Sequence, residues 1–337
     1  MPRVLISAIS AATLLMFLGP KFIAWLRANE VGQFVRAPGL IPAGHAEKQG
    51  TPTMGGLLIL VATTLPFIIL SSRSTEAMLV LFTTLACGAI GFIDDFMKVV
   101  KKRSLGLSGR WRMFGLLLVS IVLVWASVDV VGLPTALTVP LLDESFEIGI
   151  AAFFVVIFLV VAGAANAVNL TDGLDGLAPG CTIMAAAAFA VLSYVVGNVV
   201  FSNYLFIQFV PGAGELSVFC AALAGATLGF LWFNCHPAEI FMGDTGALPL
   251  GGAIGFVAVC IKQELLLVVI GGIFVVEAAS VIIQVLNYKF TKRRVFRIAP
   301  LHHHFQYKGW AESKVTIRFW IIAAILAAFG LATLKLR

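Results

Sequence analysis

Two adjacent carboxylates, Asp94 and Asp95, stand at the end of a long apolar run, and Lys98 follows Asp94 by four residues. An ionised side chain near hydrocarbon is costly unless it meets a partner, a metal ion or water. One interpretation is a solvated helix end at which Asp94 and Lys98 form an ion pair. The other is a base or metal-ligand pair beside a phosphate-binding cation. Because adjacent helical residues point about 100° apart, we expect the two carboxylates not to face each other.

Acids and amides are also concentrated at 166–176. Asn166 and Asn169 are about one helical turn apart, and Asp172 and Asp175 repeat this spacing, each followed by glycine. Asn, Asp and Gly are ordinary turn formers, but glycines such as Gly173 and Gly176 also let a backbone approach a ligand closely. Two carboxylates and two amides without a basic residue in so short a segment favour a site for a polar ligand.

Asp244 lies in a Gly-Asp-Thr-Gly segment at the start of another apolar run. As an isolated acid it would serve as a helix N-cap. Together with the carboxylates of the other segments it would instead complete a site for a hard metal ion. Mg²⁺ prefers one or two carboxylates, water and substrate phosphate oxygens, so the acids and the many Lys and Arg residues favour Mg²⁺ over zinc.

Three consecutive histidines, His302, His303 and His304, lie in an interior segment. They cannot all face one way on a helix, and one functional histidine with two structural ones is the simplest interpretation. Phosphate binding or acid–base work suits their near-neutral pKa, whereas a zinc site would need a second cluster at ligand spacing. Glu277 lies in the middle of an apolar run, where a hydrogen bond to a neighbouring helix is as good an explanation as function, and we leave it out of the predicted site.

The elements that must position these residues are membrane helices. Of the 337 residues, 60% are hydrophobic and only 12% are charged, which is typical of a polytopic membrane protein. The composition and the ten apolar stretches, each close to the ~20 residues that cross a bilayer, predict an all-α protein with one integral-membrane domain over residues 1–337. The stretches are 4–22, 54–71, 77–94, 113–131, 149–168, 177–196, 216–233, 246–262, 265–287 and 316–334.

The charge distribution predicts how the chain is oriented. Most of the 23 Lys and Arg residues lie in three loops, which the positive-inside rule assigns to the cytoplasm. Both termini should then be extracytoplasmic, with a small extracytoplasmic hairpin near 133–147, and the acidic and histidine segments should face the cytoplasm. The net charge of +6 is therefore a topology signal and an attraction to anionic lipid, not an indication of nucleic-acid binding. The five cysteines show no metal-ligand spacing, so we expect them to pack as small apolar residues.

The motifs resemble those of the phospho-N-acetylmuramoyl-pentapeptide-transferase family, within the polyprenyl-phosphate N-acetylhexosamine-1-phosphate transferase superfamily. The Asp94-Asp95 pair and the Asn-x-x-Asn-x-x-Asp element are similar to the whole superfamily. The segment Pro300–His304 with Lys308–Trp310 resembles the muramoyl-pentapeptide branch. The resemblance covers essentially the whole chain.

This resemblance implies an Mg²⁺-dependent transfer from UDP-MurNAc-pentapeptide to undecaprenyl phosphate, giving lipid I and UMP in peptidoglycan biosynthesis. It also implies a multi-pass protein of the bacterial plasma membrane, with ten transmembrane helices, an outside N-terminus and commonly a homodimer.

The resemblance further implies roles for residues in each segment. Asp94 is similar to the residue proposed to deprotonate or orient the lipid phosphate, with Asp95 as its essential neighbour, and Asp244 is similar to the Mg²⁺ ligand. The positions that resemble the uridine pocket, with the last stacking on uracil, are Lys48, Gly173, Asp175 and Phe241. Those that resemble other nucleoside contacts are Thr53, Asn169, Asp172 and His303. Further active-site positions matched by motif are Lys98, Arg110, Asn234, His302 and His304.

Two other functions fit part of the pattern. A sister transferase that uses UDP-GlcNAc shares the acidic motifs, but the segment 302–310 argues against it. A secondary transporter for an anionic metabolite would also be polytopic with acids in its spans. Transporters usually bind their cargo near the midplane between repeats, whereas these acids are predicted at helix ends, and no internal repeat is visible.

Overall fold

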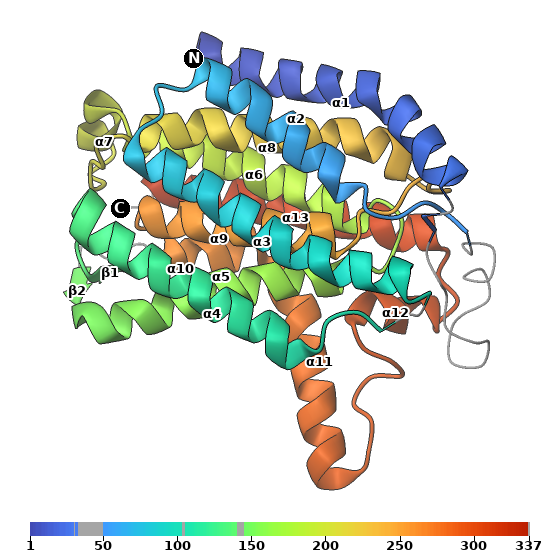
Figure 1. Cartoon of the computed structure of the whole chain (residues 1–337). Coiled ribbons are helices and arrows are strands. Elements are labelled where there is room, and N and C mark those ends of the chain that lie inside the picture. The colour runs from blue at the N-terminus through green and yellow to red at the C-terminus, as the bar shows by residue number, and fades with distance from the viewer. Residues whose placement is uncertain (30, 33–49, 103–104, 140–144, 336–337) are drawn as a thin grey trace.

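The protein is a bundle of helices that run roughly along one common direction (Figure 1). The computed structural model describes residues 1–29, 31–32, 50–102, 105–139 and 145–335, so Lys48 lies outside the described residues. The long helices are α1 Pro2–Ala28, α2 Gly56–Leu70, α3 Thr75–Val100, α4 Gly109–Trp125, α5 Gly149–Thr171, α6 Leu177–Val196, α8 Ala213–Asn234, α9 Asp244–Cys260, α11 Gly272–Thr291 and α13 Glu312–Ala332. The short elements are the π-helical turn η2 Ala126–Val131, β1 Ala136–Thr138, β2 Ser145–Glu147, α7 Val199–Tyr204, α10 Glu264–Ile270, α12 Leu301–Gln306 and the 3₁₀ turn η3 Thr333–Lys335.

Every predicted apolar stretch is helical. Among the described residues, eight helices are long and apolar enough to cross a membrane, with η2 continuing α4 and η3 continuing α13. The helices α2 and α9 are apolar but shorter, with 15 and 17 residues. The protein is therefore an all-α, multi-pass membrane protein.

The predicted single helix over 265–287 is wrong, because the chain breaks there into α10 and α11. The break falls at Gly271 and Gly272, and two successive glycines lower the cost of leaving the helical conformation. A Cβ at Gly272 would also lie 2.8 Å from Leu326 Cδ1, so the second glycine lets α11 approach α13 closely. Beyond the break, α11 leaves the bundle and projects away from it (Figure 1).

The helix α9 is the centre of the bundle. All its residues from Thr245 to Cys260 are buried, and it packs between α3 on one side and α5 on the other. Small residues allow this packing: a Cβ at Gly251 would overlap the backbone carbonyl of Ala164 on α5. Close contact through small residues is the usual way in which helices associate inside membranes.

One of the close crossings in this bundle joins α3 to the first residue of α9. A Cβ at Gly91 would overlap the carbonyl oxygen of Asp244, which is backbone and has no freedom to move aside. Gly91 lies three residues before Asp94, so its missing side chain brings Asp244 against the Asp94–Asp95 pair.

We expect Gly91→Ala to push α9 away from α3, to destabilise the protein by about 1–3 kcal/mol as an overpacked core does, and to lower the transferase activity that the sequence resemblance implies. Thermal unfolding in detergent and product release measure the two effects. Gly109→Ala is the matched control, because a Cβ at Gly109 meets no atom within 4 Å. If Gly91→Ala behaves like the control, the crossing does not set the position of Asp244.

The strands β1 and β2 form the predicted hairpin. They pair antiparallel, with Leu137 opposite Phe146, and Lys262 Nζ donates hydrogen bonds to the carbonyls of Pro134 and Ala136 at 2.6 and 3.1 Å. The hairpin lies at the same end of the bundle as the N-terminus and the end of α13 (Figure 1). The predicted site residues come from the opposite helix ends.

Candidate active site

Three carboxylates meet where the end of α3 reaches the beginning of α9. Asp94, Asp95 and Asp244 each place one oxygen within 4.8 Å of the others, and both α3 carboxylates are only 2% exposed. We expected the two carboxylates not to face each other, and this is wrong in one respect: one oxygen of each points into the same cluster. The reason is the crossing at Gly91, which brings a third carboxylate into the angle between them.

Lys98 lies among these carboxylates. Its Nζ is 2.5 Å from Asp94 Oδ2, 3.2 Å from Asp95 Oδ1 and 3.3 Å from Asp244 Oδ2. The predicted ion pair between Asp94 and Lys98 is confirmed, but it belongs to a four-residue cluster rather than to a solvated helix end. Lys98, and Arg112 beside Asp244, bring two positive charges to three carboxylates, so the cluster can take a further cation.

The second oxygens of Asp94 and Asp95 have separate partners. Asp94 Oδ1 accepts the backbone N–H of Leu107 at 2.6 Å. Asp95 Oδ2 accepts both the backbone N–H of Thr245, at 2.8 Å, and its hydroxyl, at 2.7 Å. Asp95 therefore caps the free N–H groups at the start of α9 from a different helix, in the way that an N-cap residue does.

Asp244 receives two more donors from neighbouring helices. Asn169 Nδ2 donates to Asp244 Oδ1 at 2.6 Å, and Arg112 Nη1 donates to Asp244 Oδ2 at 3.2 Å. The same guanidinium nitrogen is 3.3 Å from Asn169 Oδ1. The motif match named Arg110, which is exposed. Arg112, two residues later on α4, is the arginine that reaches the cluster. Residues two apart on a helix point to nearly opposite sides, so the two arginines do not face the cluster together.

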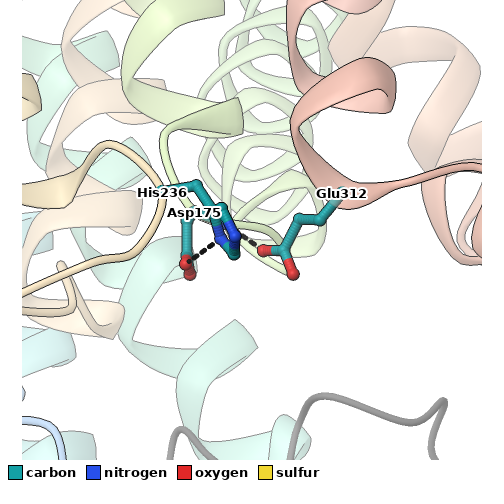
Figure 2. A group of neighbouring side chains, drawn as sticks. All are labelled: Asp175, His236 and Glu312. Carbon is teal, nitrogen blue, oxygen red and sulfur yellow. Dashed lines mark hydrogen bonds and ion pairs between the residues drawn. The ribbon is translucent and has the colours of Figure 1, made fainter.

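A second group joins Asp175 to His236 and Glu312. Figure 2 shows the His236 ring lying between the two carboxylates. His236 Nδ1 is 3.0 Å from Asp175 Oδ2, and Glu312 Oε1 accepts the backbone N–H of Asp175 at 2.8 Å. Neither His236 nor Glu312 was predicted from the sequence. Glu312 is 137 residues away from Asp175, and only the position of α13 brings it there.

Asn234 fixes the loop that carries Asp175. Its Oδ1 accepts the backbone N–H of Gly176 at 3.0 Å, and its Nδ2 donates to the carbonyl of Ile240 at 2.8 Å. Trp320 Nε1 donates to the Gly176 carbonyl at 3.0 Å from the other side. Asn234 is buried and joins the loop 172–176 to the loop 235–243, which is a positioning role.

Asp172 begins the loop and lies beyond the end of α5. Burial raises the pKa of its carboxyl to about 8, and the negative charge of Asp244 adds to the effect. Removing a carboxylate from water and placing it near like charge both favour the neutral form. At neutral pH Asp172 therefore mostly keeps its proton and is able to donate a hydrogen bond.

Phe241 and Thr53 come together through backbone pairing between their loops. The N–H of Phe241 donates to the Pro52 carbonyl at 2.8 Å, and the N–H of Gly55 donates to the Phe241 carbonyl at 2.9 Å. A Cβ at Gly243 would lie 3.2 Å from Thr53 Oγ1. Residues 52–55 thus border the beginning of α9, as the predicted part of Thr53 in the site requires.

The three histidines have three different surroundings. His302 is buried, with its Nδ1 3.1 Å from Glu277 Oε2. His303 Nδ1 is 2.8 Å from Gln306 Oε1, and His304 Nδ1 accepts the backbone N–H of Arg297 at 3.1 Å. They lie on the short helix α12, so they diverge as expected.

Two family comparisons identify the chain. Residues 77–262, more than half of the chain, match the family described as glycosyl transferase family 4. Residues 48–60 match phospho-N-acetylmuramoyl-pentapeptide-transferase signature 1. The chain belongs to the phospho-N-acetylmuramoyl-pentapeptide-transferase and polyprenyl-phosphate hexosamine-1-phosphate transferase family.

This family membership makes the protein a phosphoglycosyl transferase and links it to peptidoglycan synthesis. The family match spans Asp94 and Asp95, the loop 172–176 and Asp244, and the signature covers Thr53 and Gly55. The segment that carries Glu277, the histidines and Glu312 lies outside both matches.

The transferase's acidic cluster has the donor chemistry of a magnesium site. Asp94, Asp95 and Asp244 offer hard carboxylate oxygens that converge, and oxygen ligands are those that Mg²⁺ prefers. The nearby Lys98 and Arg112 suit a site where the remaining ligands are phosphate oxygens. The residues present therefore fit a bound Mg²⁺.

Proposed function

We propose that the protein transfers phospho-MurNAc-pentapeptide from UDP-MurNAc-pentapeptide to undecaprenyl phosphate, giving lipid I and UMP. The observation that carries the proposal is the arrangement of the cluster of Asp94, Asp95, Lys98 and Asp244. The cluster lies at the same end of the bundle as the loop 172–176, and an apolar groove begins at Val168, four residues before this loop. A soluble polyanion and a lipid phosphate would meet at such a position.

The apolar groove supports a lipid acceptor. It has a volume of about 540 Å³ and lies between α5, α9, α10 and α11, with a lining that includes Leu159, Val168, Ile254, Val268 and Ile282. Val168 is four residues from Asp172, so the groove begins near the polar loop. It extends along α5 to Val156 and further to Leu137 of the hairpin. An isoprenoid chain suits this lining, and its phosphate would lie towards Asp94.

The loop 172–176 and Phe241 support the nucleotide donor. In this proposal Phe241 stacks on uracil and Gly173, Asp175 and Lys48 complete the uridine pocket. Thr53, Asn169, Asp172 and His303 contact the remainder of the nucleoside. The positions of His236, Glu312 and Asn234 around Asp175 agree with a preorganised pocket, because each restrains the loop that would touch the ligand.

The chemistry follows from the charge of both substrates. Lys98 and Arg112 reduce the repulsion between two phosphate esters and stabilise negative charge on the departing UMP. Mg²⁺ bound at Asp244 would neutralise further charge on the pyrophosphate. Asp94 orients or deprotonates the lipid phosphate, whose oxygen forms a bond to the β-phosphorus. The bond from that phosphorus to the bridging oxygen breaks, and its electron pair leaves with UMP.

A single displacement inverts the configuration at the transferred phosphorus. An aspartyl-phosphate intermediate on Asp94 or Asp95 would require two displacements and give retention. Transfer from a donor with a chiral β-phosphorus distinguishes the two routes. Retention would rule out the one-step reaction.

The test of the function is UMP release from UDP-MurNAc-pentapeptide by the purified protein, with and without undecaprenyl phosphate and Mg²⁺. We expect UMP release only when the donor, undecaprenyl phosphate and Mg²⁺ are present together. Release from UDP-GlcNAc instead would identify the sister transferase, and uptake of an anion into vesicles without UMP formation would identify a transporter. We further propose a homodimer in the bacterial plasma membrane, with both termini outside and the site facing the cytoplasm.

A further inference from the structure

A buried glutamate on α11 holds the first of the three histidines. Glu277 is completely buried and His302 is 1% exposed. Glu277 Oε1 accepts the backbone N–H of His302 at 3.1 Å, and Glu277 Oε2 lies 3.1 Å from His302 Nδ1. Two contacts from one carboxylate fix both the backbone and the ring of His302.

This carboxylate determines which ring nitrogen carries the proton. Glu277 already accepts one N–H from His302, and an ionised carboxylate has only acceptor sites. The Nδ1 atom must therefore carry hydrogen and donate it to Oε2. The histidine is held with Nε2 as the nitrogen that is left for a ligand, since the bond made by one ring nitrogen sets the state of the other.

His302 Nε2 points at the loop of the candidate site. A Cβ at Gly173 would overlap Nε2, so only a glycine can lie this close to the ring. Among the described residues, Nε2 has no hydrogen-bond partner although it is buried. Buried polar atoms in folded proteins nearly always have a partner, and a purely structural His–Glu pair gives no reason for this one to lack it. The unpartnered nitrogen indicates a ligand that arrives at Gly173.

We propose that Glu277 is a positioning residue that presents His302 Nε2, as a hydrogen-bond acceptor, to a hydroxyl group of the nucleotide-sugar bound at the loop 172–176. The inference rests on the proposed function for the identity of this ligand. It assigns a site role to the only acidic residue in the middle of α11. It also agrees with glycine at residue 173, because a side chain there would push His302 Nε2 out of this position.

Glu277→Gln tests the proposal with almost no change of shape. The amide oxygen still accepts the backbone N–H of His302, but the amide NH₂ now faces Nδ1 and donates to it. The ring must then carry its proton on Nε2, which turns the acceptor into a donor. A wrong tautomer imposed in this way costs a serine protease about 10⁴-fold in rate, and we expect kcat/KM for the nucleotide donor to fall by about 10²–10⁴-fold.

The ¹⁵N spectrum of protein labelled at histidine reports the tautomer directly. We expect His302, identified by the signal that disappears in His302→Gln, to carry its proton on Nδ1 in the native protein and on Nε2 in Glu277→Gln. Glu277→Asp keeps the charge and should keep the native tautomer and most of the activity. If Glu277→Gln does not fold, the native spectrum and the Glu277→Asp variant still decide the point.

Glu215→Gln is the matched control. Glu215 lies at the opposite end of the bundle and also accepts a backbone N–H, that of Ser72, at 2.8 Å. This variant should leave the His302 spectrum and the activity unchanged. The double variant Glu277→Gln with His302→Gln should be no worse than His302→Gln alone, because a residue that acts through another adds nothing once the other is removed.

A native His302 with its proton on Nε2 would overturn the proposal, as would losses that add in the double variant or an unchanged kcat/KM in Glu277→Gln. The spectra need no substrate. If the protein releases no UMP from UDP-MurNAc-pentapeptide, the proposed function fails, while the tautomer measurement and binding of the true nucleotide donor still decide the role of Glu277.

Discussion

Asp244→Ala will leave the protein folded and lower UMP release at least about 10³-fold, which corresponds to about 4 kcal/mol of barrier. Asp244 is where Lys98, Arg112 and Asn169 converge, so its loss removes both the proposed Mg²⁺ ligand and the anchor of two cations. The backbone N–H bonds that start α9 come from Thr245 to Asp95 and remain in the variant. Turnover and thermal unfolding measured on the same preparation separate chemistry from stability.

Asp244→Asn isolates the charge, because its amide oxygen can still accept from Asn169. We expect nearly the same loss as with alanine. Asp129→Asn is the control: this exposed aspartate lies on η2, remote from the cluster, and its replacement should have no effect. Turnover near that of the native protein in Asp244→Ala would remove Asp244 from the site.

Lys98→Met will lower the maximal rate about 10²-fold, the effect of removing one preorganised donor from an oxyanion site. The methionine keeps the length of the side chain but leaves Asp94, Asp95 and Asp244 without their ammonium. Repulsion between these carboxylates and the phosphates of both substrates then has less compensation. Initial rates of UMP release at saturating substrates measure the loss.

Lys101→Met is the matched control for this variant. Lys101 lies three residues later on the chain and is exposed, so removing its charge should leave the rate unchanged. Lys98→Arg should recover part of the activity, because the charge remains while the planar guanidinium fits the three carboxylates less well. Equal rates for Lys98→Met and Lys101→Met would show that the ammonium of Lys98 takes no part in the reaction.

The helices and the polar segments were predictable from the sequence because each depends on neighbouring residues. Apolar runs of membrane length predict helices directly, and the short hairpin is predicted by its prolines and its alternating pattern. Asp94, Asp95, Asp244 and the acids of the loop 172–176 also stand out locally, as charges at the ends of apolar runs. Their meeting at one end of the bundle agrees with the orientation that the basic loops suggest.

The missed features depend on contacts between distant segments. Arg112 and Arg110 differ only in which face of α4 lies towards Asp244. The roles of His236 and Glu312 need the positions of α8 and α13 relative to the loop 172–176. Glu277 looked like an ordinary buried acid until α12 placed His302 beside it. The break at Gly271 was hidden because apolar residues continue on both sides of it.

The groove beside α11 opens sideways, since Leu159, Val268 and Ile282 line it and are themselves exposed. An isoprenoid chain would therefore enter the groove from the surrounding bilayer and stay within hydrocarbon throughout. The nucleotide would arrive from water at the helix ends. Two reactants with opposite solubilities then need no common solvent.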